Sequence, residues 1–321
     1  MELGPCRLTE NGVNVTLHEY SWNTNSHILF LDQPVNVGFS YSDDGSRVVR
    51  SEIAGEDAYA FFQLFFAAFP EYVSASFHIA SESYGGTYAP HAASIFHKKN
   101  KELAASPISR STRINLASVI LANGITNPLE QLATVREYAC HGPFRILDPD
   151  GKECSSMKRG SAICERLVRA CYNFPTRVGC LSTAYYCYSQ LYTPLESEYP
   201  VTNLHSALPL FTISLTETGL NLYDVRKRCS VPEYGPECFP EIGWLENWMN
   251  GEDVKRSLGV DPSLTFEACK ADVSKGFALQ ADAMRNSALL LTDLVNEGVR
   301  LLVYAGNAGQ PHRTTLGNAA L

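Results

Sequence analysis

A serine in a short polar turn is the residue of this sequence best suited to chemistry. Ser83 stands in the segment Ser81-Glu82-Ser83-Tyr84-Gly85-Gly86. The apolar run Ser76–Ala80 before this segment is typical of a buried strand, and Tyr88–Lys98 after it is typical of a helix. A serine at the turn between a strand and a helix is the usual setting of a nucleophile that attacks acyl carbon atoms. The sequence therefore predicts that Ser83 is a nucleophile.

Small residues on both sides of this serine make a sharp turn possible. Gly85 lies two positions after Ser83, and Ser81 lies two positions before it, where glycine is more usual. Serine is still small, so we expect the turn to form with some strain. The backbone N–H of Tyr84 is then the expected donor to the oxyanion. The alternative is a polar turn without chemistry.

The elements expected around this turn alternate between strands and helices. Short apolar runs predict strands at His27–Asp32, Ser76–Ala80, Ser118–Ala122 and Val299–Tyr304. Apolar residues at helical spacing predict helices at Gly55–Phe69, Tyr88–Lys98 and Ala281–Asn296, with Pro70 ending the first and Gly298 capping the last. Alternation of this kind predicts a mostly parallel sheet covered by helices.

The middle of the chain lacks this alternation of strands and helices. Between about Val135 and about Trp248, cysteines, tyrosines and prolines become frequent. We interpret residues 135–248 as a disulfide-rich insertion that stands over the sheet. Residues 1–134 and 249–321 are then the two parts of the sheet-bearing core.

Composition and charge narrow the class of protein. Hydrophobic residues make up 45% of the 321 residues and charged residues 19%, which is typical of a soluble globular protein. The net charge of -8 argues against nucleic acid as a partner, because phosphate binding requires a basic face. No window of about 18 apolar residues predicts a membrane-spanning helix. The first residues, Met1–Cys6, do not resemble a signal peptide.

The cysteines indicate an oxidising compartment. Six of the ten cysteines lie between Cys140 and Cys187, and their spacing does not fit a zinc site. Disulfides are the better interpretation, although spacing alone leaves the pairing open. Asn14-Val15-Thr16 is an acceptor for N-glycosylation, which agrees with a secretory route. A secretory route without a signal peptide predicts that residues are missing before Met1.

Several longer motifs resemble the serine carboxypeptidase family, and most closely its fungal vacuolar carboxypeptidase Y-like members. The segment Glu82–Gly86 is similar to the end of the family motif G-E-S-Y-G-G. Four further segments match family motifs in the same order: Glu2–Pro5, Phe30–Ser42, Asn123–Pro128 and Asn221–Arg226. The resemblance runs from Glu2 to about Gly306.

This resemblance implies a fold and a set of disulfides. The implied fold is the α/β-hydrolase fold, with a mostly parallel central sheet and a disulfide-rich, mainly helical insertion, incomplete at both ends. The implied disulfides are Cys140–Cys154, Cys164–Cys187, Cys171–Cys180 and Cys229–Cys238. Cys269 resembles a family cysteine whose partner lies in an upstream motif, so Cys269 and Cys6 are expected to be unpaired.

The resemblance also implies how a substrate is held. Glu2 and Glu82 match the glutamates that bind the carboxylate at a peptide's C-terminus. Two carboxyl groups in close approach share a proton, and the protonated form donates to that carboxylate. This arrangement favours acidic pH, and peptide or protein C-termini are the expected partners. No cofactor and no metal are implied, because the chemistry is covalent acyl transfer.

The rest of the family's catalytic machinery is not where the resemblance implies it. After the strand ending Val303-Tyr304-Ala305-Gly306, Gly309 stands at the position of the family's acidic residue. The family's histidine lies further downstream, and His312 is outside any matching motif. A second oxyanion donor is expected before Met1. We therefore expect Ser83 to lack both the acid and the base that a serine protease requires.

Three hypotheses follow from these observations. The first is a serine-type carboxypeptidase of vacuolar, lysosome-like or secreted location, truncated at both ends and inactive as this chain. The second is a pseudoenzyme that binds peptide C-termini without turnover. The third is a related acyltransferase or esterase. We favour the first, because the resemblance is lost abruptly after Gly306 and begins inside a motif.

Overall fold

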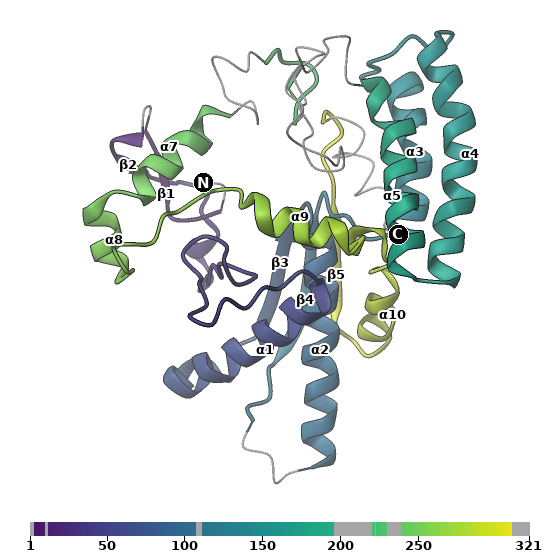
Figure 1. Cartoon of the computed structure of the whole chain (residues 1–321). Coiled ribbons are helices and arrows are strands. Elements are labelled where there is room, and N and C mark those ends of the chain that lie inside the picture. The colour runs from purple at the N-terminus through teal and green to yellow at the C-terminus, as the bar shows by residue number, and fades with distance from the viewer. Residues whose placement is uncertain are drawn as a thin grey trace. The chain divides into compact units, whose positions relative to one another are not determined.

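The computed structural model describes residues 3–9, 12–106, 111–195, 220–221, 223–229 and 239–309, which fall into two compact units (Figure 1). The first unit comprises Met1–Val48 and Cys229–Ser274, and the second comprises Val49–Arg228 and Lys275–Leu321. The division of the chain at 134/135 and 248/249 stays a prediction. Its first boundary falls inside helix α3 (Pro128–His141).

The second unit is built around a parallel sheet. Strands β3 (Phe77–Glu82), β4 (Leu116–Ala122) and β5 (Arg300–Tyr304) lie in the order β3-β4-β5, and both pairs are parallel. Ala80 is in register with Ile120, and Ile120 with Leu302. Because all three strands run the same way, their carboxyl ends meet at one edge, which is where parallel sheets place ligands.

Helices α2 (Gly85–Ala105) and α10 (Leu289–Asn296) pack on one face of this sheet. The buried residues between them are Ala89, Ala93, Val119, Leu121, Leu291, Leu294 and Val299. Helix α1 (Ser51–Ala68) packs along α2 (Figure 1), where Phe62 contacts the rings of Phe77 and Phe96. Helix α1 ends before Pro70, as expected, and Pro70 begins the short 3-10 helix Pro70–Tyr72.

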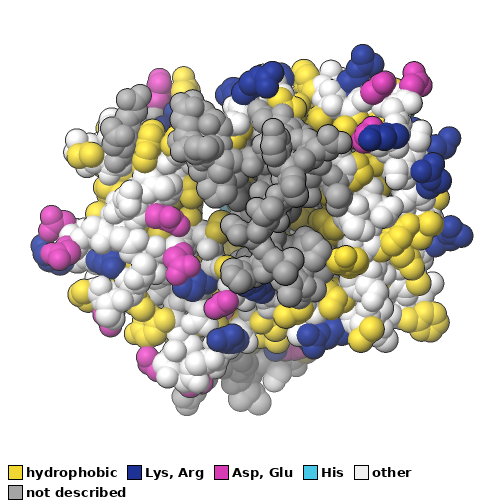
Figure 2. All heavy atoms as spheres, turned by 45° about the horizontal axis from the view of Figure 1, so that its top comes forward, with side chains coloured by type: hydrophobic (Ala, Val, Ile, Leu, Met, Phe, Trp, Pro, Cys, Tyr) yellow, Lys and Arg dark blue, Asp and Glu magenta, His cyan; other side chains and the backbone are white. Residues whose placement is uncertain are grey.

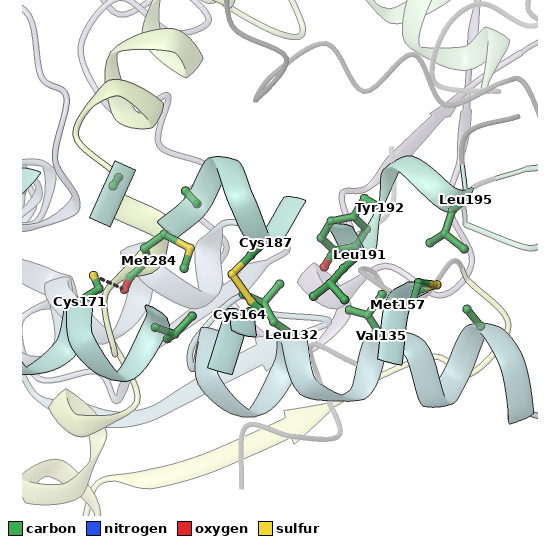
Figure 3. Packing of buried hydrophobic residues seen from close by; sticks show 14 of the residues in the cluster. Leu132, Val135, Met157, Cys164, Cys171, Cys187, Leu191, Tyr192, Leu195 and Met284 are labelled. Atoms are coloured by element: carbon green, nitrogen blue, oxygen red, sulfur yellow. Dashed lines mark hydrogen bonds between the residues drawn. A yellow bond between two sulfur atoms is a disulfide. The ribbon is translucent and has the colours of Figure 1, made fainter. Parts of the chain in front are cut away.

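Three helices of the second unit stand side by side (Figure 1). They are α3 (Pro128–His141), α4 (Lys152–Asn173) and α5 (Arg177–Leu191), followed by the 3-10 helix Thr193–Leu195. Cys140–Cys154 links α3 to α4, whereas Cys164–Cys187 and Cys171–Cys180 link α4 to α5. All six cysteines are buried among Leu132, Val135, Met157 and Leu191 (Figure 3). These three disulfides confirm the implied pairing.

The structure describes the remaining cysteines only in part. Cys229 is disulfide-bonded, and its expected partner Cys238 lies outside the described residues. Cys6 carries a free thiol, as expected, and Cys269 is exposed to solvent.

The outer face of α4 is basic. Lys158, Arg159, Arg166 and Arg169 are exposed on a chain whose net charge is -8, and only Arg169 has a carboxylate partner within α4, Glu165 at 2.9 Å. In Figure 2 the Lys and Arg side chains gather along the right edge, on the side where α4 lies in Figure 1. The disulfide-linked helices therefore present their charged side chains to water.

The first unit contains a two-stranded antiparallel sheet of β1 (Cys6–Leu8) and β2 (Val15–Leu17). It also contains the 3-10 helix Trp22–Thr24 and helices α7 (Pro240–Met249) and α8 (Glu252–Leu258). Helix α9 (Ala271–Leu279) runs from the end of this unit into the second, and the 3-10 helix Asp282–Met284 follows it. Within the described ranges, no helix has the length and apolarity needed to cross a membrane.

Two expected elements are wrong. His27–Asp32 is irregular rather than a strand, and Phe30 is 67% exposed. An apolar run becomes a strand only with a partner, and no described strand pairs with this one. The expected helix Ala281–Asn296 begins only at Leu289. Its first half is diverted because Ala281 adopts φ 50° and the backbone N–H of Ser287 donates to the Thr126 carbonyl, 2.9 Å away.

Candidate active site

The serine turn is a strained backbone conformation at the carboxyl end of β3. Ser83 has φ 55°, in the left-handed region that residues with a side chain rarely occupy. Its N–H donates to the carbonyl of Ala122 at 3.0 Å, and its own carbonyl accepts from Gly86 at 3.0 Å and Ile125 at 2.9 Å. These three hydrogen bonds stabilise the strained backbone conformation and keep Ser83 at the point where β3 passes into α2.

Close packing around the turn explains its small residues. A side-chain carbon on Gly85 would lie 2.6 Å from the Cβ of Ser81, and one on Gly86 would lie 2.4 Å from the backbone nitrogen of Ile125. Both distances are shorter than atoms tolerate, so these positions require glycine. Ser81, in the place where glycine is usual, donates its hydroxyl to the carbonyl of Gly85 at 2.9 Å. The serine at 81 thus closes the turn with a hydrogen bond.

A cavity of about 470 Å³ opens beside Ser83, within the second unit. The carboxyl ends of the three strands form its floor, with Glu82 at the end of β3, Ser83 after it, Asn123 after β4 and residues 306–309 after β5. Apolar and aromatic side chains form much of its wall: Ile125, Leu132, Tyr188, Tyr192 and Met284. A mostly apolar cavity with a few polar groups at one end is typical of a small-ligand site.

Asn123 is a second strained residue at this edge. It has φ 45°, its N–H donates to the carbonyl of Tyr304 at 2.9 Å, and its side-chain oxygen accepts from Gly306 N–H at 3.4 Å. The ends of β4 and β5 are therefore tied together beside Ser83. The motif Asn123–Pro128 carried this signal in the sequence, but no role was predicted for Asn123.

The segment after β5 contributes only backbone and small side chains to the cavity. The hydroxyl of Tyr138 donates to the carbonyl of Asn307 at 2.5 Å, and the N–H of Val225 donates to the carbonyl of Ala308 at 2.7 Å. Gly309, the position matched to the family's acidic residue, lines the same cavity as Ser83. The structure therefore brings these two predicted positions together.

Neither histidine near the serine in sequence approaches it. His78 on β3 pairs through Nδ1 with the hydroxyl of Ser118 at 2.6 Å, and His91 is half-buried in α2. Among the described residues, no histidine lines the cavity, and no hydrogen bond reaches the hydroxyl oxygen of Ser83. His312 and Glu2 lie outside the described residues.

An ion pair borders the cavity. Arg226 donates to both carboxylate oxygens of Asp224, at 2.7 and 2.9 Å, and lies over the ring of Phe144 at 5.4 Å. The hydrogen bond from Arg226 lowers the pKa of Asp224 to about 2. Since the two charges neutralise each other, this wall adds a polar rim without a net charge.

In the described part of the chain, no group of histidine, cysteine, aspartate and glutamate side chains could hold a metal ion. The cavity presents the hydroxyl of Ser83 and the carboxyl groups of Glu82 and Asp224, of which Asp224 is paired with Arg226.

Comparison with known proteins identifies the family. Residues 1–314 match the model of the serine carboxypeptidase family. The chain is 36% identical over 310 residues to a carboxypeptidase Y homolog A of Trichophyton verrucosum, and 35% identical over 310 residues to that of Neurospora crassa. Each match covers 96% of this chain but only 50% and 49% of the relative, so the chain spans about half the length of these relatives.

A solved structure supports the fold. The crystal structure of Kex1(delta)p, a prohormone-processing carboxypeptidase of Saccharomyces cerevisiae, superimposes with a TM-score of 0.76 at 19% sequence identity. The superposition covers 98% of this chain and 62% of the other. The parallel sheet, the serine turn and the disulfide-linked helices have the α/β-hydrolase fold, and the chain belongs to the serine carboxypeptidase family.

Proposed function

We propose that Ser83 is the nucleophile of a carboxypeptidase site that releases C-terminal residues from peptides through an acyl-enzyme. The observation that carries this proposal is the strained Ser83 on the floor of a mostly apolar cavity, with Tyr84 following it. Attack by the hydroxyl on the last peptide bond would form the acyl-enzyme and release the C-terminal residue, and water would then release the shortened peptide.

Glu82 is the group we assign to the substrate's terminal carboxylate. It lies next to Ser83 and lines the cavity. A carboxyl group binds another carboxylate only when one of the two is protonated, because two like charges in close approach repel each other. Binding is therefore expected to strengthen as the pH falls. Glu2, outside the described residues, is the second carboxyl that the motif Glu2–Pro5 suggests.

The 321-residue chain is expected to turn over peptides very slowly by itself. Gly309 offers no carboxylate at the acid position, and no described histidine lies at Ser83. Loss of the base alone lowers the turnover rate of a serine protease by several orders of magnitude. For compartment, the three buried disulfides and the exposed acceptor Asn14 support a vacuolar or secretory location.

Labelling with a fluorophosphonate tests the nucleophile. The purified chain is incubated with the probe with and without imidazole, which supplies the missing base from solution. We expect slow labelling without imidazole, faster labelling with it, and none in Ser83→Ala. Fast stoichiometric labelling without imidazole would show that a base is already in place. If a folded chain is not labelled either with or without imidazole, Ser83 is not the nucleophile.

Peptide binding tests the carboxylate site separately. A fluorescent peptide with a free C-terminus is compared with the same peptide as its amide, at pH 5 and pH 7. We expect the free acid to bind more tightly than the amide, with the larger difference at pH 5 and a smaller one in Glu82→Gln. Equal affinity for acid and amide would favour the esterase or acyltransferase alternative.

A further inference from the structure

A buried carboxylate lies beneath the serine turn and has no role in the site described so far. Asp282 begins the 3-10 helix Asp282–Met284 and is 6% exposed. Its oxygens accept from the N–H of Ser51 at 3.0 Å, the hydroxyl of Ser51 at 2.5 Å and the hydroxyl of Tyr84 at 2.8 Å. No lysine or arginine among the described residues forms an ion pair with it. A buried charge without a cation is costly, so these donors must compensate for its lost hydration.

One side of this carboxylate holds the start of helix α1. The residue before α1, Arg50, forms no capping hydrogen bond with its side chain, and Ser51 is completely buried. An N-cap residue usually provides a side-chain acceptor for the backbone N–H groups at the start of its own helix. At α1, Asp282 provides this acceptor from a distant part of the chain. The positive end of the helix dipole also favours a negative charge at this place.

The other side holds the residue after the nucleophile. The ring of Tyr84 packs edge-on against Phe277 at 5.8 Å and tilted against Tyr88 at 5.0 Å. Burial, followed by the nearby negative charge of Asp282, raises the pKa of the Tyr84 hydroxyl well above its usual value. The phenol therefore stays protonated and donates to the carboxylate. With its ring packed and its hydroxyl bonded, Tyr84 has little freedom to rotate.

The segment that carries Asp282 is itself fixed by the disulfide-linked helices. Ala281 and Met284 are buried in the cluster of residues around Cys164–Cys187, and the carbonyl of Met284 lies 3.7 Å from the sulfur of Cys171 (Figure 3). Met284 and Ala283 also line the cavity. One short segment thus contacts the disulfide cluster, the cavity, α1 and the serine turn.

We propose that Asp282 is a positioning residue: its side-chain oxygens fix Tyr84, and thereby the Ser83–Tyr84 peptide whose N–H faces the oxyanion, against the start of α1. This inference rests on the proposed role of Ser83. It assigns no contact between Asp282 and substrate. Its physical basis is that the strained turn must be held to well under an ångström for an N–H donor to act on a developing oxyanion.

Two variants form a matched pair for the test. Tyr84→Phe and Ser51→Ala each remove one hydroxyl that donates to the same oxygen of Asp282. Both are expected to lower the stability of the chain by similar amounts. Only Tyr84→Phe loosens the serine turn, whereas Ser51→Ala loosens the start of α1. If the role of Asp282 is purely structural, the two variants should not differ in the reactivity of Ser83.

The first readout is the rate of fluorophosphonate labelling in imidazole, measured beside the affinity for a C-terminal peptide. Tyr84→Phe is expected to lower the labelling rate about tenfold or more with unchanged peptide affinity. Ser51→Ala is expected to leave both values unchanged. Equal labelling rates in the two variants would overturn the positioning role.

Hydrogen exchange supplies a readout that does not depend on reactivity. The amides of residues 84–86 are expected to exchange about tenfold faster in Tyr84→Phe and at the wild-type rate in Ser51→Ala. Asp282→Asn, if it folds, should accelerate exchange at both places. If the wild-type chain fails to label even with imidazole, the proposed nucleophile is wrong, and the exchange pattern still decides the role of Asp282. Unchanged exchange at residues 84–86 in Tyr84→Phe would refute it.

Discussion

At the scale of single residues, the serine turn depends on two glycines for different reasons. Gly85 leaves room for the Cβ and hydroxyl of Ser81, whereas Gly86 leaves room for the backbone of Gly124 and Ile125. A methyl group at 86 would push apart the start of α2 and the segment after β4. The position therefore couples helix packing to the placement of Ser83.

Gly86→Ala is expected to destabilise the chain by about 1–3 kcal/mol, because the added carbon would lie 2.4 Å from a backbone nitrogen. Urea denaturation measures the change. Gly243→Ala is the matched control, since Gly243 also lies in a helix and its added carbon meets nothing within 4 Å. The control is expected to be neutral or stabilising by up to about 1 kcal/mol. A similar loss in both variants would argue against the close contact at 86.

His91 gives the chain a sensitivity to acid. Burial lowers the pKa of His91 below its usual value of 6.5, the nearby Asp282 and Glu52 oppose this shift, and Arg50 adds to it. The folded state therefore binds a proton at His91 less readily than the unfolded state. Above about pH 6.5 His91 is neutral in both states and does not reduce the free energy of unfolding. As the pH falls from there through the folded-state pKa, the unfolded state takes up the proton first, and the free energy of unfolding decreases.

His91→Gln is expected to reduce the loss of stability between pH 7 and pH 5, because the variant has no imidazole to protonate. The free energy of unfolding is measured at both pH values in wild type and variant. His97→Gln is the control, since His97 lies in the same helix α2 but pairs with Glu297 at 2.9 Å. An unchanged pH dependence in His91→Gln would contradict the proposed effect of burial.

At the scale of elements, three disulfides link the helices α3, α4 and α5 within a buried apolar cluster. The two disulfides between α4 and α5 span different lengths of chain, with sequence separations of 23 for Cys164–Cys187 and 9 for Cys171–Cys180. A longer closed loop restricts the unfolded chain more, so its removal costs more.

Replacing both cysteines of the Cys164–Cys187 pair with alanine is expected to cost about 3 kcal/mol, and somewhat less for the Cys171–Cys180 pair. Urea denaturation without reductant measures both. A larger loss for the shorter loop would indicate that packing of the sulfur atoms, rather than chain entropy, dominates. The buried position of all four cysteines makes this second possibility a real competitor.

At the scale of the whole molecule, the disulfide-linked helices form part of the cavity wall. Tyr188, Tyr192 and Leu132 of its wall come from, or directly follow, the disulfide-linked helices. The floor of the cavity comes from the sheet, whose strands contain no cysteine. The wall and the floor should therefore respond differently to the redox state in which the chain folds.

Chain that has folded under reducing conditions is expected to bind a C-terminal peptide at least about tenfold more weakly than oxidised chain, because the apolar wall is lost. Fluorescence titration of the two preparations measures the difference, and hydrogen exchange at β3–β5 serves as the control for a folded sheet. Equal affinities would show that the helical wall does not contribute to binding.

The sequence by itself determined the local pattern of the molecule. The apolar runs at 76–80, 118–122 and 299–304 became three parallel strands, and the serine at 83 became a strained turn, because period and turn chemistry are local properties. The disulfides needed more than spacing. Their pairing came from the resemblance to the family, since cysteines at these spacings permit many pairings.

The tertiary structure decided what depends on distant partners. His27–Asp32 has the composition of a strand but no described strand to pair with, and Ala281–Asn296 has the composition of a helix but is diverted by Thr126. Asp282 gave no signal in the sequence, because its hydrogen-bond donors lie about two hundred residues away along the chain. A buried carboxylate acquires its role only when folding brings such donors together, because they replace the water it has lost.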